Sequence, residues 1–571
     1  MKNLLKYING YKKESVLGPL FKLFEATLEL IVPLVIAAII DNGIDNGDRG
    51  YVVKMSLLLV LLGAVGLAFS VTAQYFAAKA SVGYATKLRY ALFAHIETLS
   101  YTEIDTLGTS TLITRMTSDA NQVQTGLNLA LRLLLRSPFV VFGAMIMAFT
   151  IDVKSALTFA AVIPTLSVVV FGIMLISMPL YKKVQSKLDK VLSKTRENLS
   201  GVRVIRAFCR EQNEIEEFKE RNSDLAATQK YVGRFSALMN PLTYILINFA
   251  ILWLIDIGAL QVNSGILTQG MVIALYNYMS QILVELIKLA NLIITITKAL
   301  ASAARIQSVF EIQSSQESGN AKTGTDSGCS VEFSNVTLEY KNSGAPSLTD
   351  ISFKVKKGDT VGIIGGTGSG KTSLINLIPR FYDATSGAVF IDGADVKTYD
   401  TEALREKIGV VPQKAVLFTG SIRENMLWGN KFASDEDIFR ALETAQAKDV
   451  VIDKGGLDFK VEQGGRNLSG GQRQRLTIAR ALVKDPEILI LDDSASALDF
   501  ATDAALRLAI RNMAGEKTVF IVSQRASSIM HADKIIVLDD GEAVGIGTHD
   551  ELLESCPVYQ EIYYSQFKKE A

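Results

Sequence analysis

The chain has 571 residues, and its 59 basic residues equal its 59 acidic residues in number, so no basic excess points to a nucleic-acid partner. Hydrophobic residues make up 49% of the sequence and the mean hydropathy is +0.24, which is high for a soluble protein. The three cysteines (Cys209, Cys329 and Cys556) are odd in number and widely spaced, so neither a disulfide framework nor a metal cluster follows from them, and reduced thiols are expected.

Six apolar runs occupy the first half of the chain. They lie near residues 16–40, 52–78, 128–150, 155–179, 240–262 and 266–298. Each is long enough to cross a lipid bilayer, which takes about 20 helical residues. The first run is far too long for a cleavable signal peptide and is interpreted as a retained anchor. We therefore expect an all-α transmembrane domain with six spans.

Two long polar stretches, 79–127 and 180–239, separate the second span from the third and the fourth from the fifth. Between residues 180 and 235 there are 13 lysines and arginines, whereas the short loops hold only Arg49 and Lys154. Because positive residues remain on the cytoplasmic side, this asymmetry predicts the orientation of a multi-pass protein, which we expect in the plasma membrane. Both termini and both long stretches then lie in the cytoplasm.

The two long polar stretches are predicted to be helical extensions of the spans, because 180–235 has helical periodicity and no internal proline. Each contains a break that is typical of a short crossing helix, Thr106 to Ser110 in one and Ser200 to Val202 in the other. One interpretation is a plain helical hairpin. The other is a docking tip that touches an ATPase domain.

Ionisable residues inside predicted spans are costly and are functional candidates. Glu25 and Glu29 fall in the first span, Asp256 in the fifth, and Glu285 and Lys288 in the sixth. Glu285 and Lys288 are three residues apart, which favours a structural ion pair on one helix face. Glu29 has no obvious partner in its own helix, so we interpret it as an unpaired carboxylate and a candidate contact for a cationic or amphipathic substrate.

A change of composition separates the membrane part from the rest. Residues 312–330 are rich in Ser, Gly and Thr, as is typical of a linker. From Val331 onward, strand-like and helix-like segments alternate, which predicts an α/β domain. The expected organisation is a transmembrane domain over 1–305, a linker over 306–330 and a nucleotide-binding domain over 331–571.

A glycine-rich loop follows an apolar strand-like run, 360–364, and precedes a helix-like run, 373–378. This order of strand, loop and helix is the P-loop pattern. Glycines let several backbone N–H groups face one phosphate, Lys371 would reach the β/γ-phosphates, and the Thr372 hydroxyl would hold Mg²⁺. The predicted ATP-binding residues of this loop are Gly365, Gly366, Thr367, Gly368, Ser369, Gly370, Lys371 and Thr372.

Two further motifs follow the P-loop. The apolar strand 488–491 ends in Asp492, the Walker B pattern in which a carboxylate holds Mg²⁺. A serine at a helix start with adjacent glycines suits a second phosphate contact, and such a segment opens the basic helix from Arg473 to Lys484. Its residues are Leu468, Ser469, Gly470, Gly471 and Gln472.

Together, the six spans, the P-loop and the Leu468–Gln472 signature resemble an ABC transporter half of the type I exporter class, over almost the whole chain. The resemblance implies a six-helix membrane domain followed by an α/β ABC ATPase domain. It also implies that two halves pair head to tail, with each ATP held between the P-loop of one half and the signature of the other.

The same resemblance implies roles for single residues. Tyr340 matches the aromatic residue that stacks on adenine, although a strand-face aromatic is the alternative reading. Gln413 matches the residue near Mg²⁺ and the docking helices. Glu462 lies in a segment used for contact between the halves, and Asp499 belongs to the loop that faces the opposite ATP site.

Two positions depart from the family pattern. Asp493 stands where a Glu usually polarises the attacking water, and Gln524 stands where a His usually contacts the γ-phosphate. Both changes, beside an intact P-loop and signature, resemble the degenerate-site subunit of bacterial heterodimeric multidrug exporters. The resemblance implies a catalytic set of Asp493, Gln524 and Gln413, and a partner half-transporter with an intact catalytic Glu and switch His.

The expected function is ATP-driven export by alternating access, with drugs or other amphipathic small molecules as substrates and ATP and Mg²⁺ as cofactors. An ATP-gated channel or regulatory subunit, and a lipid or peptide exporter, stay open as alternatives. An importer half is disfavoured, because importers of this superfamily usually keep the ATPase and membrane parts on separate chains.

Overall fold

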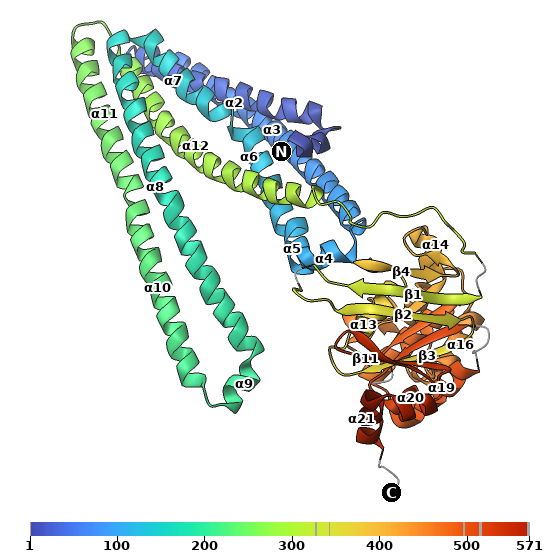
Figure 1. The fold of residues 1–571 in the computed structure, drawn as a ribbon. Helices are drawn as coiled ribbons and strands as arrows, with labels where there is room; N and C mark the ends of the chain where they lie inside the picture. The colour runs from blue at the N-terminus through green and yellow to red at the C-terminus, as the bar shows by residue number, and fades with distance from the viewer. Residues whose placement is uncertain (1, 326–327, 342, 495–496, 513–516, 568–571) are drawn as a thin grey trace. The chain divides into compact units, whose positions relative to one another are not determined.

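The computed structural model describes residues 2–325, 328–341, 343–494, 497–512 and 517–567 (Figure 1). The chain forms two compact units. One is built from Met1–Glu97 and Ser110–Ile312, and is called the helical unit here. The other is built from Thr98–Thr109 and Gln313–Ala571, and is called the ATPase unit.

Among its described residues, the regular elements of the helical unit are all helices. Its elements are α1 (Lys2–Leu5), η1 (Lys6–Ile8), α2 (Lys12–Ala38), η2 (Ile39–Ile44), α3 (Arg49–Glu97), α5 (Thr109–Thr114), η3 (Arg115–Asp119), α6 (Ala120–Leu133), α7 (Arg136–Ile151), α8 (Val153–Ser200), α9 (Val202–Ala207), α10 (Glu211–Ala237), α11 (Met239–Asn263) and α12 (Gln269–Phe310).

Within the described residues, six helical stretches are long and apolar enough to cross a membrane, as the sequence predicts. They are Lys12–Ile44, Arg49–Glu97, Thr109–Ile151, Val153–Ser200, Glu211–Asn263 and Gln269–Phe310. These stretches extend well beyond the apolar runs, which confirms that the long polar stretches continue as helix. Helix α8 lies side by side with α10 and α11 along its length (Figure 1).

Both predicted breaks occur next to short helices. Helix α4 (Tyr101–Leu107) ends at Gly108, whose φ of +75° lies in the left-handed region that favours glycine. Helix α9 follows Gly201 between the two long helices α8 and α10. A short helix is therefore present at both predicted breaks.

Ionisable side chains inside the helical unit form a network that joins three helices. Arg136 Nη1 donates to Glu285 Oε1 at 2.6 Å and Arg136 Nη2 donates to Glu29 Oε2 at 2.6 Å. Glu285 also accepts from Ser137 Oγ at 2.8 Å and from Lys288 Nζ at 2.8 Å. The expected Glu285–Lys288 pair is confirmed.

The interpretation of Glu29 as an unpaired carboxylate is wrong, because its partner comes from helix α7. Residue spacing within one helix could not reveal this pair, because Glu29 and Arg136 are 107 positions apart in the chain. The Glu29 side chain is nevertheless 40% exposed, against 3% for Glu285. Glu29 is therefore the accessible acid of this network.

The ATPase unit is an α/β domain. Its strands are β1 (Cys329–Leu338), β2 (Leu348–Lys356), β3 (Thr360–Gly365), β4 (Ser386–Ile391), β5 (Ala394–Asp395), β6 (Ile408–Val411), β7 (Gly420–Ser421), β8 (Lys460–Val461), β9 (Ile488–Asp492), β10 (Thr518–Val522), β11 (Lys534–Asp539) and β12 (Glu542–Gly547). Its helices are α4, α13 (Lys371–Leu377), α14 (Thr401–Glu406), α15 (Ile422–Leu427), α16 (Asp435–Thr444), α17 (Lys448–Asp453), η4 (Gln463–Gly465), α18 (Gly470–Val483), α19 (Phe500–Arg511), η5 (Ala526–Ser528), α20 (His549–Ser555) and α21 (Pro557–Gln566).

The main sheet has the order β12-β11-β3-β10-β9-β6, and its strands from β11 to β6 are parallel. A second, antiparallel sheet has the order β2-β1-β4-β5. Parallel strands end at the same edge of a sheet, which is where ligands bind in open α/β folds. The segments that follow β3, β10, β9 and β6 are therefore neighbours at one edge.

Two hydrophobic cores support different parts of this unit. One core joins β1–β4 to the helix after the P-loop and includes Ile363, Leu374 and Phe520. The other joins α15–α18 to β9 and includes Leu468 and Leu476. The P-loop and the signature helix thus rest on separate cores of the same unit.

Helix α4 belongs to the ATPase unit although it lies in the first polar stretch of the sequence. The Tyr101 ring packs against Phe381 with ring centroids 4.8 Å apart. Asp105 Oδ2 accepts a hydrogen bond from Tyr382 Oη at 2.6 Å. The prediction of a docking tip is thereby confirmed for the first break.

Candidate functional site

The P-loop connects the end of β3 to the start of α13, as the sequence pattern predicts. Gly365 admits no side chain, because a Cβ atom there would lie 2.1 Å from the carbonyl oxygen of Leu538. Gly370 has a φ of +94°, which an L-residue adopts only under strain. The loop therefore requires glycine at both positions, as the P-loop pattern predicts.

Lys371 folds across this turn. Its Nζ donates to the carbonyl oxygens of Gly365 and Gly366 at 3.0 and 2.5 Å, and lies 3.3 Å from Ser369 Oγ. Burial lowers the pKa of Lys371, while the nearby carboxylates of Asp492 and Asp493 oppose that shift. The ammonium group is thus held against the backbone of the loop.

Thr372 and Asp492 face one another across the site. Thr372 Oγ1 lies 3.2 and 3.3 Å from the two carboxylate oxygens of Asp492. Asp492 ends strand β9 and is buried, and this burial raises the pKa of its carboxyl group. A hydroxyl and a carboxylate oxygen are the hard ligands that Mg²⁺ prefers alongside substrate phosphates, so the donor set fits this ion.

Asp493 follows Asp492 at the sheet edge. Its backbone has a φ of +44°, and its N–H donates to the carbonyl of Val522 on the neighbouring strand at 3.0 Å. Its Oδ2 lies 3.5 Å from Gln413 Nε2, from the segment after β6. The fold therefore brings the predicted pair Gln413 and Asp493 together beside the Thr372–Asp492 pair.

Gln524 follows β10 at the same edge and has an exposed side chain. Its carbonyl oxygen accepts from Gln566 Nε2 at 2.8 Å, and Gln566 Oε1 accepts from the N–H of Ala526 at 2.9 Å. The last residue of α21 thus holds both sides of the switch segment 524–526. Sequence reasoning missed Gln566, because no local motif marks a glutamine 40 positions from its partner.

Tyr340 follows strand β1 in the ATPase unit. Its Oη donates to Ser373 Oγ at 3.0 Å, and its ring meets Tyr382 edge-on with centroids 4.9 Å apart. Burial raises the pKa of Tyr340. A cavity of about 530 Å³, lined by residues that include Tyr340, Tyr382 and Asp105, lies beside the ring.

The signature segment begins helix α18. Ser469 Oγ accepts from the N–H of Gln472 at 3.3 Å, and Gln472 Oε1 accepts from the N–H of Ser469 at 2.9 Å. This reciprocal cap fixes the helix start. A Cβ atom at Gly470 would meet nothing within 4 Å, so this side of the helix start is open to a ligand. Asp499 caps α19 in a similar way by accepting from the N–H of Thr502 at 3.3 Å.

A P-loop, a Thr372–Asp492 oxygen pair that fits Mg²⁺ and a capped signature helix thus lie on the same chain as six helical stretches long and apolar enough to cross a membrane. This combination defines a membrane transporter driven by nucleotide.

Comparison with known proteins identifies the family. Residues 15–286 match the model of the ABC transporter transmembrane region and residues 348–496 match the ABC transporter model. An uncharacterized ABC transporter ATP-binding protein of Mycobacterium bovis is 37% identical over 99% of this chain and 97% of its own length. The chain belongs to the ABC transporter family.

Two further proteins resemble this chain over most of its length. An ATP-dependent lipid A-core flippase of Desulfotalea psychrophila is 33% identical over 84% of each chain. The structure of a bacterial Atm1-family ABC exporter with ATP bound has the same fold, with a TM-score of 0.80, 24% identity, and coverage of 99% of this chain and 100% of that chain. The protein is accordingly a multi-pass, ATP-driven ABC exporter half whose ATPase domain binds ATP.

Proposed function

We propose that this chain is one half of a heterodimeric exporter of amphipathic compounds, in which its own P-loop forms a weakly hydrolytic ATP site. The observation that carries the proposal is the pair Asp493 and Gln524 at the sheet edge that also holds Lys371, Thr372 and Asp492. The machinery for holding Mg-ATP is complete there, while both groups expected to promote attack on the γ-phosphate are altered.

The geometry of Asp493 supports slow hydrolysis. Its carboxylate is one methylene shorter than that of a glutamate, and its backbone is fixed by the N–H bond to Val522 at 3.0 Å. The carboxylate therefore falls short of the attacking water. A displacement of about 1 Å at a reacting group costs on the order of a hundredfold in rate. Gln524 is neutral and supplies no charge near the γ-phosphate.

The residues that would hold the cofactors are those of the P-loop, with Thr372 and Asp492 on Mg²⁺ and Gln413 beside them. Bound Mg²⁺ would neutralise phosphate charge. In the described residues no cluster of three or more His, Cys, Asp or Glu side chains offers a separate metal site.

The signature segment supports the proposal that this chain completes an ATP site on a partner chain. Ser469, Gly470, Gly471 and Gln472 keep a capped, open helix start, which suits the phosphates of an ATP on a partner chain. A homodimer would contain two altered sites. A partner half-transporter with a catalytic Glu and a switch His gives one efficient site, completed by this chain's signature.

ATPase rates of purified proteins test the assignment. In the complex, Asp493→Ala should lower ATP hydrolysis modestly, because this site contributes little. Ser469→Arg should nearly abolish hydrolysis, because the arginine intrudes on the partner's nucleotide. If the chain alone hydrolyses ATP at the rate of the complex, the asymmetric assignment is wrong.

The transported compound is proposed to be amphipathic, either a drug-like molecule or a lipid. The relative named a lipid A-core flippase favours the lipid as the second candidate. Vesicles that contain the complex separate these cases, since drug accumulation is measured in the lumen and lipid movement by headgroup accessibility. ATP-dependent uphill accumulation also distinguishes a pump from an ATP-gated channel, which only dissipates gradients.

The plasma membrane is the proposed location, with both termini in the cytoplasm, on the basis of the Lys and Arg asymmetry between long and short loops.

Glu29 is proposed to contact cationic substrates. It is the exposed acid of the network around Arg136, and a substrate cation could compete with the guanidinium for its carboxylate.

A further inference from the structure

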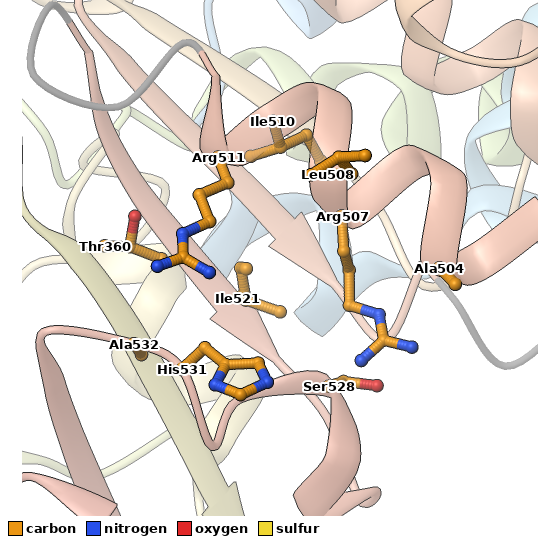
Figure 2. A pocket seen from close by; sticks show the side chains of 10 residues that line it. All are labelled: Thr360, Ala504, Arg507, Leu508, Ile510, Arg511, Ile521, Ser528, His531 and Ala532. Carbon is orange, nitrogen blue, oxygen red and sulfur yellow. The ribbon is translucent and has the colours of Figure 1, made fainter.

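A cavity in the ATPase unit lies between helix α19 and the segment that follows strand β10 (Figure 2). Its volume is about 260 Å³, and none of its lining residues belongs to the P-loop or the signature. The residues that matter for its chemistry are Thr360, Arg507, Arg511, Ile521, Ser528 and His531. The polar groups among these residues are predominantly hydrogen-bond donors.

Arg507 is held in place by the protein itself. Its Nη1 donates to the carbonyl of Ser527, and its Nη2 lies 3.2 Å from the carboxylate of Asp503. Its Nε donates to the backbone carbonyl of Asp503 at 3.4 Å. A guanidinium group has five N–H donors, so these contacts position the group and leave donors for a ligand.

Arg511 lies four residues further along α19, on the same face of the helix. Its side chain is exposed and has no ion-pair or hydrogen-bond partner within the part of the chain that the structure describes. Figure 2 shows the guanidinium groups of Arg507 and Arg511 and the ring of His531 arranged around one space. Three nitrogen-bearing side chains therefore surround the same volume.

Ser528 provides an independent sign of a ligand. It is 7% exposed, and its Oγ is buried with no hydrogen-bond partner among the described residues. Buried polar groups are almost always paired, because an unpaired donor loses its water without replacement. Ser528 lines the cavity, so a bound acceptor there would satisfy its hydroxyl.

We propose that this cavity binds a phosphate group, either as inorganic phosphate or as a small phosphate monoester. A tetrahedral anion offers oxygens in several directions, which matches donors that come from α19, from Ser528 and from His531. Guanidinium groups form strong charge-assisted bonds with such oxygens. Ile521 adds an apolar wall on which the carbon part of an ester could rest.

The acids near the cavity do not cancel this preference. The carboxylate of Asp503 is directed to Arg507, and Asp533 Oδ2 accepts the backbone N–H of Thr360 at 2.8 Å. One oxygen of each carboxylate is thus engaged by the protein, whereas Asp503 Oδ1 is buried without a hydrogen-bond partner among the described residues. Arg511 carries a positive charge that no described acid neutralises.

Isothermal titration calorimetry on the full-length chain in lipid nanodiscs tests the proposal. The P-loop is first saturated with Mg²⁺ and a non-hydrolysable ATP analogue, so that added phosphate reports on other sites. Inorganic phosphate and phenyl phosphate are the two probes. Tighter binding of phenyl phosphate indicates that an ester is the natural ligand, and equal affinity indicates free phosphate.

Three variants locate the binding. Arg511→Gln should weaken phosphate binding about tenfold, the size expected for one charge-assisted contact. Ser528→Ala removes a hydroxyl that no described group binds, so the fold is retained and the affinity should fall severalfold. Arg440→Gln is the matched control, because Arg440 is an exposed arginine on α16 of the same unit and should leave binding unchanged.

Saturable binding that Arg511→Gln and Ser528→Ala both weaken supports the site. Absence of saturable binding at tens of millimolar phosphate overturns it. Binding that neither variant alters, or that Arg440→Gln reduces equally, also overturns it.

Discussion

The contact between Gln566 and the switch segment allows a test of whether helix α21 holds that segment in place. One side-chain amide has the donor and acceptor of a peptide group, and Gln566 uses both, on the carbonyl of Gln524 and on the N–H of Ala526. The helix that carries it is anchored by Tyr559, which is fully buried in the core with Ile529. Replacing Gln566 with leucine removes both bonds and keeps a similar side-chain size.

The magnitude follows from the two hydrogen bonds. Each contributes about 0.5–1.5 kcal/mol net, and the bond to Ala526 N–H is partly buried. A loss of about 1 kcal/mol at that bond corresponds to a factor of about five in the opening equilibrium of the segment. We therefore expect the Ala526 amide to exchange with deuterium about five times faster in the Gln566→Leu variant.

Hydrogen–deuterium exchange with mass spectrometry on the full-length chain measures this change, using overlapping peptides that isolate Ala526. Gln566→Glu separates the two bonds, because a carboxylate still accepts from Ala526 but repels the carbonyl of Gln524. Gln560→Leu is the control: Gln560 lies on the same helix and donates to Leu553 at 2.7 Å, away from the switch segment. If the Ala526 amide exchanges at the wild-type rate in the Gln566→Leu variant, the two hydrogen bonds of Gln566 do not hold the switch segment.

Three further predictions concern the helical unit. Arg136→Leu should lower the thermal unfolding midpoint in detergent, because the buried Glu285 then keeps only Lys288 and Ser137 as partners. Removing one partner of a buried pair costs at most about 3–5 kcal/mol, and the remaining partners reduce that loss. The double variant Arg136→Leu/Glu285→Leu should recover part of this loss, and a lower midpoint for the double than for the single variant contradicts the pairing. Glu29→Gln should reduce vesicle transport of cations more than of neutral compounds, whereas equal loss with lower protein yield points to folding. A cysteine introduced at Gly47 should react with an impermeant thiol reagent added outside intact cells, whereas a cysteine introduced at Gln185 should not. Labelling of the cysteine at position 185 would refute the proposed orientation.

Features that depend only on residues adjacent in the chain were predictable from the sequence. A bilayer span needs about 20 adjacent apolar residues, and each of the six runs supplies them locally. The P-loop is similar, because the strand, the glycines from Gly365 to Gly370 and the following Lys371 are neighbours in the chain. The short helices beside Gly108 and Gly201 were also signalled by local breaks in periodicity.

The grouping of the site segments at one edge of the sheet could be deduced only once the strand order was known. Sequence motifs identified Gln413, Asp493 and Gln524 by resemblance, but their spatial relation depends on the order β3-β10-β9-β6. That order is set by crossovers between strands that are far apart in the chain. No local pattern specifies which strand lies beside which.

Contacts between distant side chains were decided by the tertiary structure alone. The sequence established Glu29 as an acid within a span, whereas only the packing of α2 against α7 showed that Arg136 neutralises it. Only the tertiary structure likewise showed the hydrogen bonds of Gln566 to the switch segment and the cavity that Arg507 and Arg511 line. Local periodicity fixes which face of a helix is apolar, but the rotation and approach of a second helix determine which side chains meet.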